Sequence, residues 1–422
     1  MRKKLLVAAA AVFTLALGLE APREASAIPA FARQTGLACL TCHFQHFPTL
    51  NAYGRTFKAG GFTQVGGQSL VEGEHLSIPA SLNASLITKV RYQKRSGDNR
   101  AEGNTNTGAT GNASELNKGE LQFPDEAALL IGGRGGEHVG FLLELSLKDG
   151  DSRFTSFKMP FSFDVASTNL LVIPFSTDSQ GAAYGLELLN TGALRLQRPI
   201  EHRTEFSAQQ YIGTDGAATG FTLAAVNKMG FFNYTPYYKE HGNAAVGPFI
   251  NYFRAGVTPQ IGGWDTAVGV QSWSGTSKTG ATDAPNRVHA EAWALDAQAQ
   301  GEVGSMPLGV YFSYARAAKS KTGEEANTMN ASTRKNKSAV AINGELGVIP
   351  HRLTAALGYR VGKDGDSNDD GKQRQNALTL GFVYEAMQNL ELQLNNSWYN
   401  GDAKPGSDSG NMLTTLMLFA AF

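Results

Sequence analysis

Apolar and polar residues alternate in many runs along this chain, and clusters of turn-forming residues separate the runs. Clear examples are the runs 86–93, 139–147, 293–300 and 378–385. Successive side chains of a β-strand point to opposite faces, so each run predicts a strand with one apolar face and one polar or small-residue face. No stretch after residue 27 approaches the roughly 20 apolar residues that a membrane-spanning helix needs. A closed antiparallel β-barrel, with lipid outside and water or a plug inside, satisfies both observations.

The connections between the expected strands point to the same architecture. Counted back from Phe422, longer polar connections alternate with shorter ones: 401–411, 387–389, 363–375, 348–352, 317–337, 301–307 and 274–288. Outer-membrane barrels have long extracellular loops and short periplasmic turns, which places the C-terminus on the periplasmic side. About 347 barrel residues at roughly 21 per strand and connection predict about 16 strands. Counts of 14 and 18 stay open, because the pattern between Phe154 and Ile212 is ambiguous.

The two ends of the chain predict export and an outer-membrane destination. Arg2–Lys4 is positively charged, Leu5–Leu19 is apolar and Ala25–Ala27 has a small-residue cleavage pattern, so residues 1–27 are interpreted as a signal peptide. The apolar run is too short for the alternative, a transmembrane helix. Met412–Phe422 alternates and ends on an aromatic residue, which resembles the assembly signal of outer-membrane barrels. The expected partners are therefore outer-membrane lipid and the barrel-assembly machinery; the alternative is the last strand of a soluble β protein.

Cys39 and Cys42, the only two cysteines of the chain, form a C-x-x-C-H run with His43. This spacing is typical of c-type haem attachment, in which two thiols bind the macrocycle and the histidine ligates the iron. The alternatives are a redox disulfide and half of a zinc site. A zinc site needs two more ligands nearby and the chain has no other cysteine, while no βαβ pattern surrounds the motif. The sequence therefore predicts one covalent haem c, with Cys39 and Cys42 as attachment points and His43 as the proximal ligand.

The segment 28–74 carries this motif and lacks the period-two pattern. It is interpreted as a monohaem cytochrome c-like domain, followed by a porin-like barrel at 75–422. A compact domain of about 45 residues has a diameter of roughly 24 Å, and a 16-strand barrel leaves roughly 20 Å between its side chains. The expected fold is therefore an all-β, antiparallel transmembrane barrel of the outer membrane, whose small haem domain plugs the lumen or caps its periplasmic mouth.

The residues around the motif, Pro29–Gly36 before it and Phe44–Gly61 after it, carry a family resemblance. With the motif they resemble the fused monohaem cytochrome–porin family of outer-membrane iron oxidases, and Pro124–Leu129 and Gly132–Arg134 are similar to that family more weakly. The resemblance implies that the two cysteines and the histidine of the motif bind haem. It also implies an Fe(II):cytochrome c oxidoreductase, which accepts electrons from extracellular Fe(II) and passes them to a periplasmic c-type cytochrome.

Two other functions stay open. The family also occurs in organisms that are not known to oxidise iron, so the barrel could conduct electrons from another donor. The second alternative is a diffusion porin whose haem domain gates or senses. Lys and Arg number 37 and Asp and Glu number 37, so the charge balance gives no support for a nucleic-acid partner. The chain lacks G-x-S-x-G, P-loop, dinucleotide and H-E-x-x-H motifs, so hydrolytic and nucleotide chemistry have no support either.

The second axial ligand of the iron is not determined by the sequence. His46 follows His43 by three residues and has difficulty reaching the opposite haem face, so packing or a propionate hydrogen bond is favoured for it. The remaining candidates lie farther along the chain, at His75, Met159 and Met229. Axial identity matters because it sets much of the haem potential.

Three cations flank the motif, and one acidic loop follows much later. Arg33, Arg55 and Lys58 are expected to neutralise haem propionates, to hold the domain to luminal carboxylates, or to be solvated surface charges. Residues 366–371 have the first half of a calcium-loop pattern without its closing glutamate, because Ala377 occupies that place. A solvated hairpin loop is favoured there over weak capture of Ca²⁺ or Fe²⁺.

Overall fold

The computed structural model describes residues 29–74, 76–98, 113–148, 153–195, 199, 206–242, 247–280, 286–366, 373–402 and 409–422. The predicted signal peptide lies outside these residues. So do His75 and most of the acidic loop 366–371.

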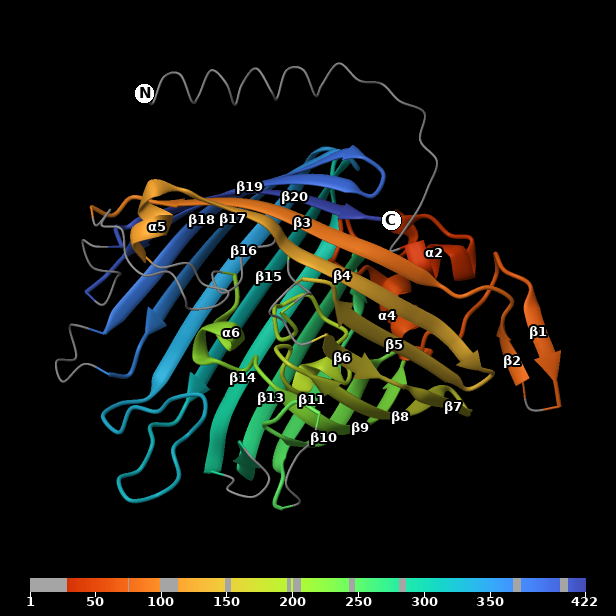
Figure 1. Cartoon of the computed structure of the whole chain (residues 1–422), viewed down its shortest axis with the longest axis horizontal. Coiled ribbons are helices and arrows are strands. Elements are labelled where there is room, and N and C mark those ends of the chain that lie inside the picture. The colour runs from red at the N-terminus through yellow and green to blue at the C-terminus, as the bar shows by residue number, and fades with distance from the viewer. Residues whose placement is uncertain are drawn as a thin grey trace.

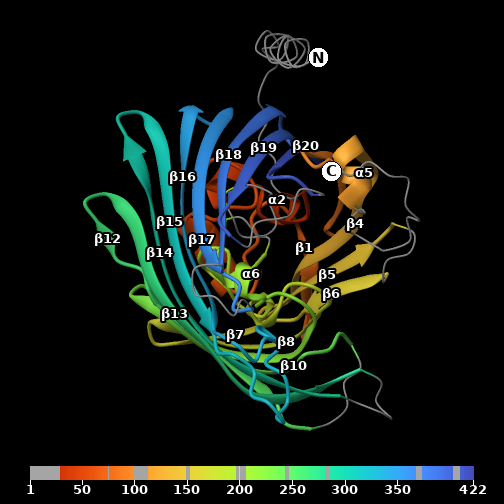
Figure 2. The same cartoon turned by 90° about the vertical axis from the view of Figure 1, so that its left-hand side faces the viewer.

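Antiparallel strands close into one barrel of sixteen strand positions (Figures 1 and 2), which confirms the predicted class and strand number. The strands are β3 (Ala84–Arg95), β4 (Glu120–Gly136), β5 (Val139–Ser146), β6 (Phe154–Lys158), β7 (Phe161–Val165), β8 (Thr168–Thr177), β9 (Ala218–Asn227), β10 (Gly230–Tyr238), β11 (Ile250–Val257), β12 (Gln260–Ile261), β13 (Trp264–Thr279), β14 (Asn286–Val303), β15 (Met306–Ala317), β16 (Lys337–Ile349), β17 (Leu353–Lys363), β18 (Arg374–Met387), β19 (Leu390–Asn400) and β20 (Met412–Ala421). The last strand closes the barrel on the first, with Leu413 opposite Arg95 and Ala421 opposite Ile87.

Two of the sixteen positions are interrupted. β6 and β7 both pair with β5 and β8 and fill one position, and β11 and β12 both pair with β13 and fill another. Pro160 and Pro259 stand at the two interruptions. Proline has no N–H to donate to a strand ladder, so a break at these positions is its direct consequence.

The alternation of the sequence corresponds to the two faces of the wall. Leu86, Trp293 and Leu378 are exposed on the outside, whereas Ile87 and Ala294, each one residue later, are buried on the luminal side. A continuous belt of exposed apolar side chains suits a hydrocarbon environment. Among the described residues, no helix has the length and apolar character needed to cross a membrane.

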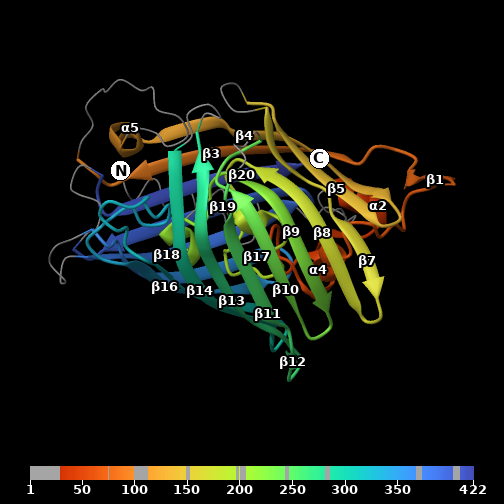
Figure 3. The same ribbon diagram turned by 90° about the horizontal axis from the view of Figure 1, so that it is seen from below.

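Long and short connections segregate to opposite ends of the barrel, as predicted (Figure 3). The short turns include 304–305, between β14 and β15, and 388–389, between β18 and β19. The connection expected at 274–288 is shorter than predicted, because β13 and β14 continue their pairing to Thr279 and Asn286.

The segment 29–69, hereafter the plug, lies inside the barrel at the short-turn end. It contains α2 (Pro29–Thr35), α3 (Cys39–Cys42) and α4 (Ala52–Ala59), and a hairpin of β1 (Leu70–Gly73) and β2 (Leu76–Pro79) follows it outside the barrel. Phe47 stacks on Phe419 of β20 with ring centroids 5.2 Å apart. Arg55 pairs with Asp265 of β13 at 2.7 Å. These contacts place the plug in the lumen rather than beyond the mouth.

The described residues of the connection between β8 and β9, which are 178–195, 199 and 206–217, also fold into the lumen and are called the inner loop here. They contain η1 (Ala182–Tyr184) and α6 (Ala208–Ile212), while the short helix α5 (Ala113–Lys118) belongs to the connection between β3 and β4. Buried Ala292, Ala315 and Ala339 of the barrel wall pack in one cluster with the inner loop. Small side chains on the wall leave room for a loop inside the barrel, so the main core of the protein sits in the lumen.

Candidate functional site

The two cysteines of the motif are held by the short helix α3 and its contact with α4. Residues three apart lie on one helix face, so Cys39 and Cys42 are neighbours. Asn51 caps α4, and its Nδ2 donates to the carbonyls of Leu40 at 3.2 Å and Thr41 at 3.0 Å. At Gly54 a Cβ would lie 2.2 Å from the Cys42 carbonyl oxygen. Only glycine allows α4 to approach the motif this closely.

His43 presents one ring nitrogen for ligation. Its Nδ1 lies 3.3 Å from the Thr49 carbonyl oxygen, which can only accept a hydrogen bond, so Nδ1 is the protonated nitrogen and Nε2 keeps its lone pair. Burial lowers the pKa of His43 to about 4, so the ring is neutral at pH 7. A neutral imidazole whose other nitrogen donates to a carbonyl is the arrangement of a metal-ligating histidine.

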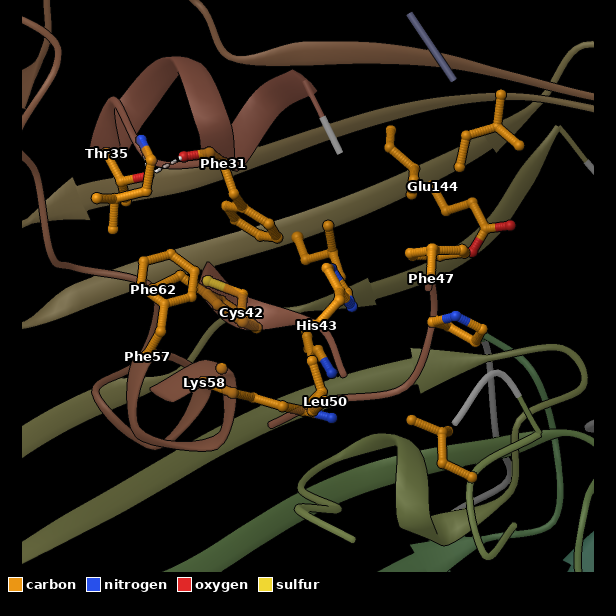
Figure 4. A pocket seen from close by; sticks show the side chains of 18 of the residues that line it. Phe31, Thr35, Cys42, His43, Phe47, Leu50, Phe57, Lys58, Phe62 and Glu144 are labelled. Atoms are coloured by element: carbon orange, nitrogen blue, oxygen red, sulfur yellow. Dashed lines mark hydrogen bonds between the residues drawn. The ribbon is translucent and has the colours of Figure 1, made fainter. Parts of the chain in front are cut away.

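A cavity of about 1220 Å³, counted to its open mouth, lies beside this ring and is called the central cavity (Figure 4). Cys42 and His43 point into it from the plug (Figure 4), and Phe31, Phe57 and Phe62 cluster at its edge with centroids 5.0–5.8 Å apart. The barrel strands and the inner loop form the facing wall, with Ile87, Lys89, Glu126, Leu130, Leu142, Glu144, Lys158, Tyr184 and Leu194. Cofactor pockets are likewise concave and mostly apolar, with a small number of placed polar groups. The cavity, the thiol and the free imidazole nitrogen fit a c-type haem.

The second thiol opens on a neighbouring cavity of about 470 Å³, called the side cavity, which is lined by Cys39. His43 and Phe47 line both cavities and separate them. Burial raises the pKa of Cys39 to about 12 and that of Cys42 to about 11. Both groups are therefore thiols at neutral pH in the protein without a bound group.

Among the candidates for the second axial ligand, His46 has another role. Its Nε2 lies 2.9 Å from Oε2 of Glu345, on β16, and its Nδ1 lies 2.7 Å from the Phe47 carbonyl oxygen. Burial by itself would lower the pKa of His46, but the Glu345 carboxylate outweighs it and raises that pKa to about 9. His46 is thus a charged anchor of the plug, which agrees with the packing role favoured from its position in the sequence.

The other axial candidates receive no support from their positions. Met229 is exposed in the turn between β9 and β10, and Met159 lies in the interruption between β6 and β7. Neither belongs to the described lining of the central cavity. His75 lies outside the described residues.

The three flanking cations separate into different roles. Arg33 is exposed and donates to the Ala84 carbonyl at the start of β3. Arg55 holds the plug to Asp265, one of the uses expected for it. Lys58 lines the central cavity.

Sequence reasoning missed Lys158 and Tyr184 of the facing wall. Alternation does place the wall lysines on the luminal face, but no local signal shows which strands lie opposite the motif.

We expect the plug to loosen as the pH rises from 7 to 10. The folded-state pKa of His46 is about 9, above the ordinary value of 6.5, so its pairing with Glu345 stabilises the fold fully below pH 6.5 and is lost as the pH passes 9. The effect is on the order of 3 kcal/mol. The measurement is protease cleavage of the plug in detergent-solubilised protein across this range.

His46→Gln is the matched control for this pH dependence. Burial lowers the pKa of Lys58 to about 8, which makes a contribution of opposite sign between pH 8 and 10.5. Because Lys58 is present in both proteins, the difference between them isolates His46. An equal rise in cleavage in His46→Gln would contradict the assignment.

No protein-family model matches the chain, and no curated protein matches it either. Solved structures do match. OprB of Pseudomonas putida has a TM-score of 0.51 at 10% identity, covering 81% of this chain and 94% of that one. The outer-membrane channel DcaP of Acinetobacter baumannii has a TM-score of 0.47 at 12% identity, with 81% and 97% covered. An anion-selective porin from Comamonas acidovorans has a TM-score of 0.45 at 12% identity, with 81% and 99% covered. At these identities the likeness to OprB concerns the fold alone, which is that of a porin barrel.

Proposed function

We propose that this protein is an outer-membrane barrel that carries one covalent haem c and moves electrons from an extracellular donor to a periplasmic c-type cytochrome. The observation that carries the proposal is the state of His43, whose ring is neutral, is fixed through Nδ1 and lines a mostly apolar cavity beside Cys42. The family resemblance of the plug names Fe(II) as the donor.

A haem in this cavity supplies a one-electron redox centre, so the reaction needs no general acid or base. The protein contributes position and exclusion of water. If haem is bound, His43 would hold the iron through Nε2, and Cys39 and Cys42 would attach the macrocycle to α3. The plug and the inner loop occupy the lumen on either side of the central cavity and limit the access of bulk water to it.

The plug and the inner loop are joined to each other, which supports a closed lumen. Leu50 of the plug and Asn190 of the inner loop exchange two hydrogen bonds, from the Leu50 N–H at 2.7 Å and to the Leu50 carbonyl at 2.8 Å. Asn190 N in turn donates to Oε1 of Gln298 on β14 at 2.7 Å. A lumen bridged from plug to wall suits a redox site better than a wide diffusion pore.

A porin-like channel is the second candidate, and two observations favour it. The fold is that of a porin barrel, like that of OprB. A further open cavity, lined in part by Arg55 and Glu137, lies at the short-turn mouth between α4 and the turns. In this second interpretation, the plug gates the channel or acts as a sensor, and the C-x-x-C-H motif serves that gating or sensing role.

The test of the proposal is anaerobic stopped-flow mixing of the oxidised, purified protein with Fe(II) near neutral pH. We expect rapid growth of the reduced-haem spectrum, and its loss in His43→Ala protein whose barrel assembles normally. A haem that stays oxidised under excess Fe(II), but is reduced by another membrane-impermeant donor, would remove iron and leave the conduit. Protein without haem that forms a large stable pore would support the channel instead.

A further inference from the structure

Two lysines from different elements meet in the central cavity. Lys58 comes from α4 of the plug, and Lys158 ends β6 of the barrel wall. Figure 4 shows the Lys58 side chain running along the cavity toward Leu50. The two are close enough for the charge of Lys58 to act on Lys158. Two amines, which carry like charges when protonated, therefore face one cavity.

Lys158 is buried, at 3% exposed, and its described partners are all uncharged. Its Nζ donates to the Tyr184 carbonyl at 3.0 Å and lies 4.3 Å from the centroid of the Tyr184 ring. It makes no ion pair within the part of the chain that the structure describes. By contrast, Lys89 of the same cavity is 2.7 Å from Oε2 of Glu126. An ammonium buried without an anion is costly, so this end of the cavity is built for an anionic group.

We propose that Lys58 and Lys158 bind the two propionate carboxylates of the haem, an inference that rests on the proposed function. The charges match, since one haem presents two carboxylates and this site presents two ammonium groups. Charge-assisted hydrogen bonds from ammonium to carboxylate would supply the counter-charge that Lys158 lacks. Lys58 would hold one propionate from the plug, and Lys158 would hold the other from the barrel wall. The haem would therefore join the plug to the wall.

A different role, in which one lysine amine ligates the iron opposite His43, is less well matched. The iron offers one open position, whereas two lysines converge on the cavity. An amine ligand must also lose its proton, while a carboxylate partner uses both groups in their charged form. The spectroscopic arm of the test below separates the two roles.

The test is a redox titration of the purified holoprotein with Lys158→Leu, Lys158→Arg and Lys58→Leu. The matched control is Lys337→Leu on β16, whose ammonium lies over the Tyr211 ring outside the central cavity. Haem content is first measured as the pyridine haemochrome. A nearby cation favours the reduced haem, so each Leu variant is expected to lower the equilibrium constant for reduction about tenfold, which is about 59 mV for one electron. Lys158→Arg and Lys337→Leu should keep the wild-type potential.

The pH dependence gives a second readout. A buried carboxylate that loses its cation has a raised pKa, so the potential of Lys158→Leu should become pH-dependent between about pH 5 and 7. Unchanged potentials and pH profiles in both Leu variants would overturn the inference while leaving the haem in place. A change of iron spin state in one Leu variant would assign that lysine to the iron instead. Wild-type protein without haem would overturn the proposed function and this inference together.

Discussion

Replacing Cys39 and Cys42 together by alanine is expected to remove all covalently bound haem. Haem c is held by two thioether bonds, and these are the only cysteines in the chain, so no other thiol can take their place. The measurement is denaturing gel electrophoresis with peroxidase staining, together with the pyridine haemochrome of the purified protein. A stained band that survives the loss of both sulfurs would refute covalent attachment at this motif.

The barrel should assemble normally in this variant, which makes the loss of haem interpretable. The one described hydrogen bond to these sulfurs runs from Gln388 Nε2 to Cys39 at 3.9 Å, a weak contact. The close approach of α4 to the motif involves the backbone carbonyl of Cys42, which alanine keeps. Heat-modifiable gel mobility checks assembly. Met229→Ala, in an exposed turn, is the control and should stain like wild type.

The barrel could be predicted from the sequence because lipid and lumen impose opposite chemistry on successive residues. Leu86 and Ile87 are both apolar, so these two residues alone do not show which face is luminal. Lys89 and Arg91 share a face with Ile87 and mark it as the luminal one, and both cations are buried there. The same rule held on β14, where Trp293 is exposed and Ala294 is buried. Closure then follows, because an open sheet in a membrane leaves unpaired backbone groups at its edges.

The inner loop could not be predicted, since its conformation depends on distant partners. Residues 154–212 read as ambiguous because Pro160 interrupts one strand position and the loop that follows β8 has no period of its own. Its residues Glu187 and Thr191 are held by the wall residues Arg254 and Asp296, which are far away in sequence. No local pattern marks them as its anchors.

The candidate site was likewise predictable only in part: its local motif could be predicted, but the residues that face the motif could not. The spacing of Cys39, Cys42 and His43 carries local chemistry, and the structure brings them together on one short helix and its end. The wall facing them comes from four strands and the inner loop, so Lys158 and Tyr184 depend on how the plug docks. The second axial ligand of the iron is the clearest example of what the sequence could not predict. A residue that ligates from across a cavity stands at no fixed spacing from the motif.

Arg254→Leu is expected to turn a barrel of low conductance into one with large, noisy conductance in planar bilayers. Arg254 of β11 is fully buried and donates to Glu187 of the inner loop at 3.0 and 3.1 Å and to Asp296 of β14 at 2.7 and 2.8 Å. Removing it leaves two buried carboxylates without a cation, which costs about 3–5 kcal/mol. The inner loop can relieve this cost by leaving the wall, and the lumen then opens.

Two further variants make the conductance result specific. Arg254→Lys keeps the charge, but an ammonium has no planar fork with which to bind both carboxylates, so an intermediate conductance is expected. Arg287→Leu removes one member of an exposed pair with Glu325, whose side chains are 58% and 36% exposed, and it should leave conductance unchanged. Because none of these variants changes the motif, haem content should stay at the wild-type level in all of them. Wide, stable conductance of the wild type would instead favour the diffusion channel, and a silent Arg254→Leu barrel would show that the plug alone closes the lumen.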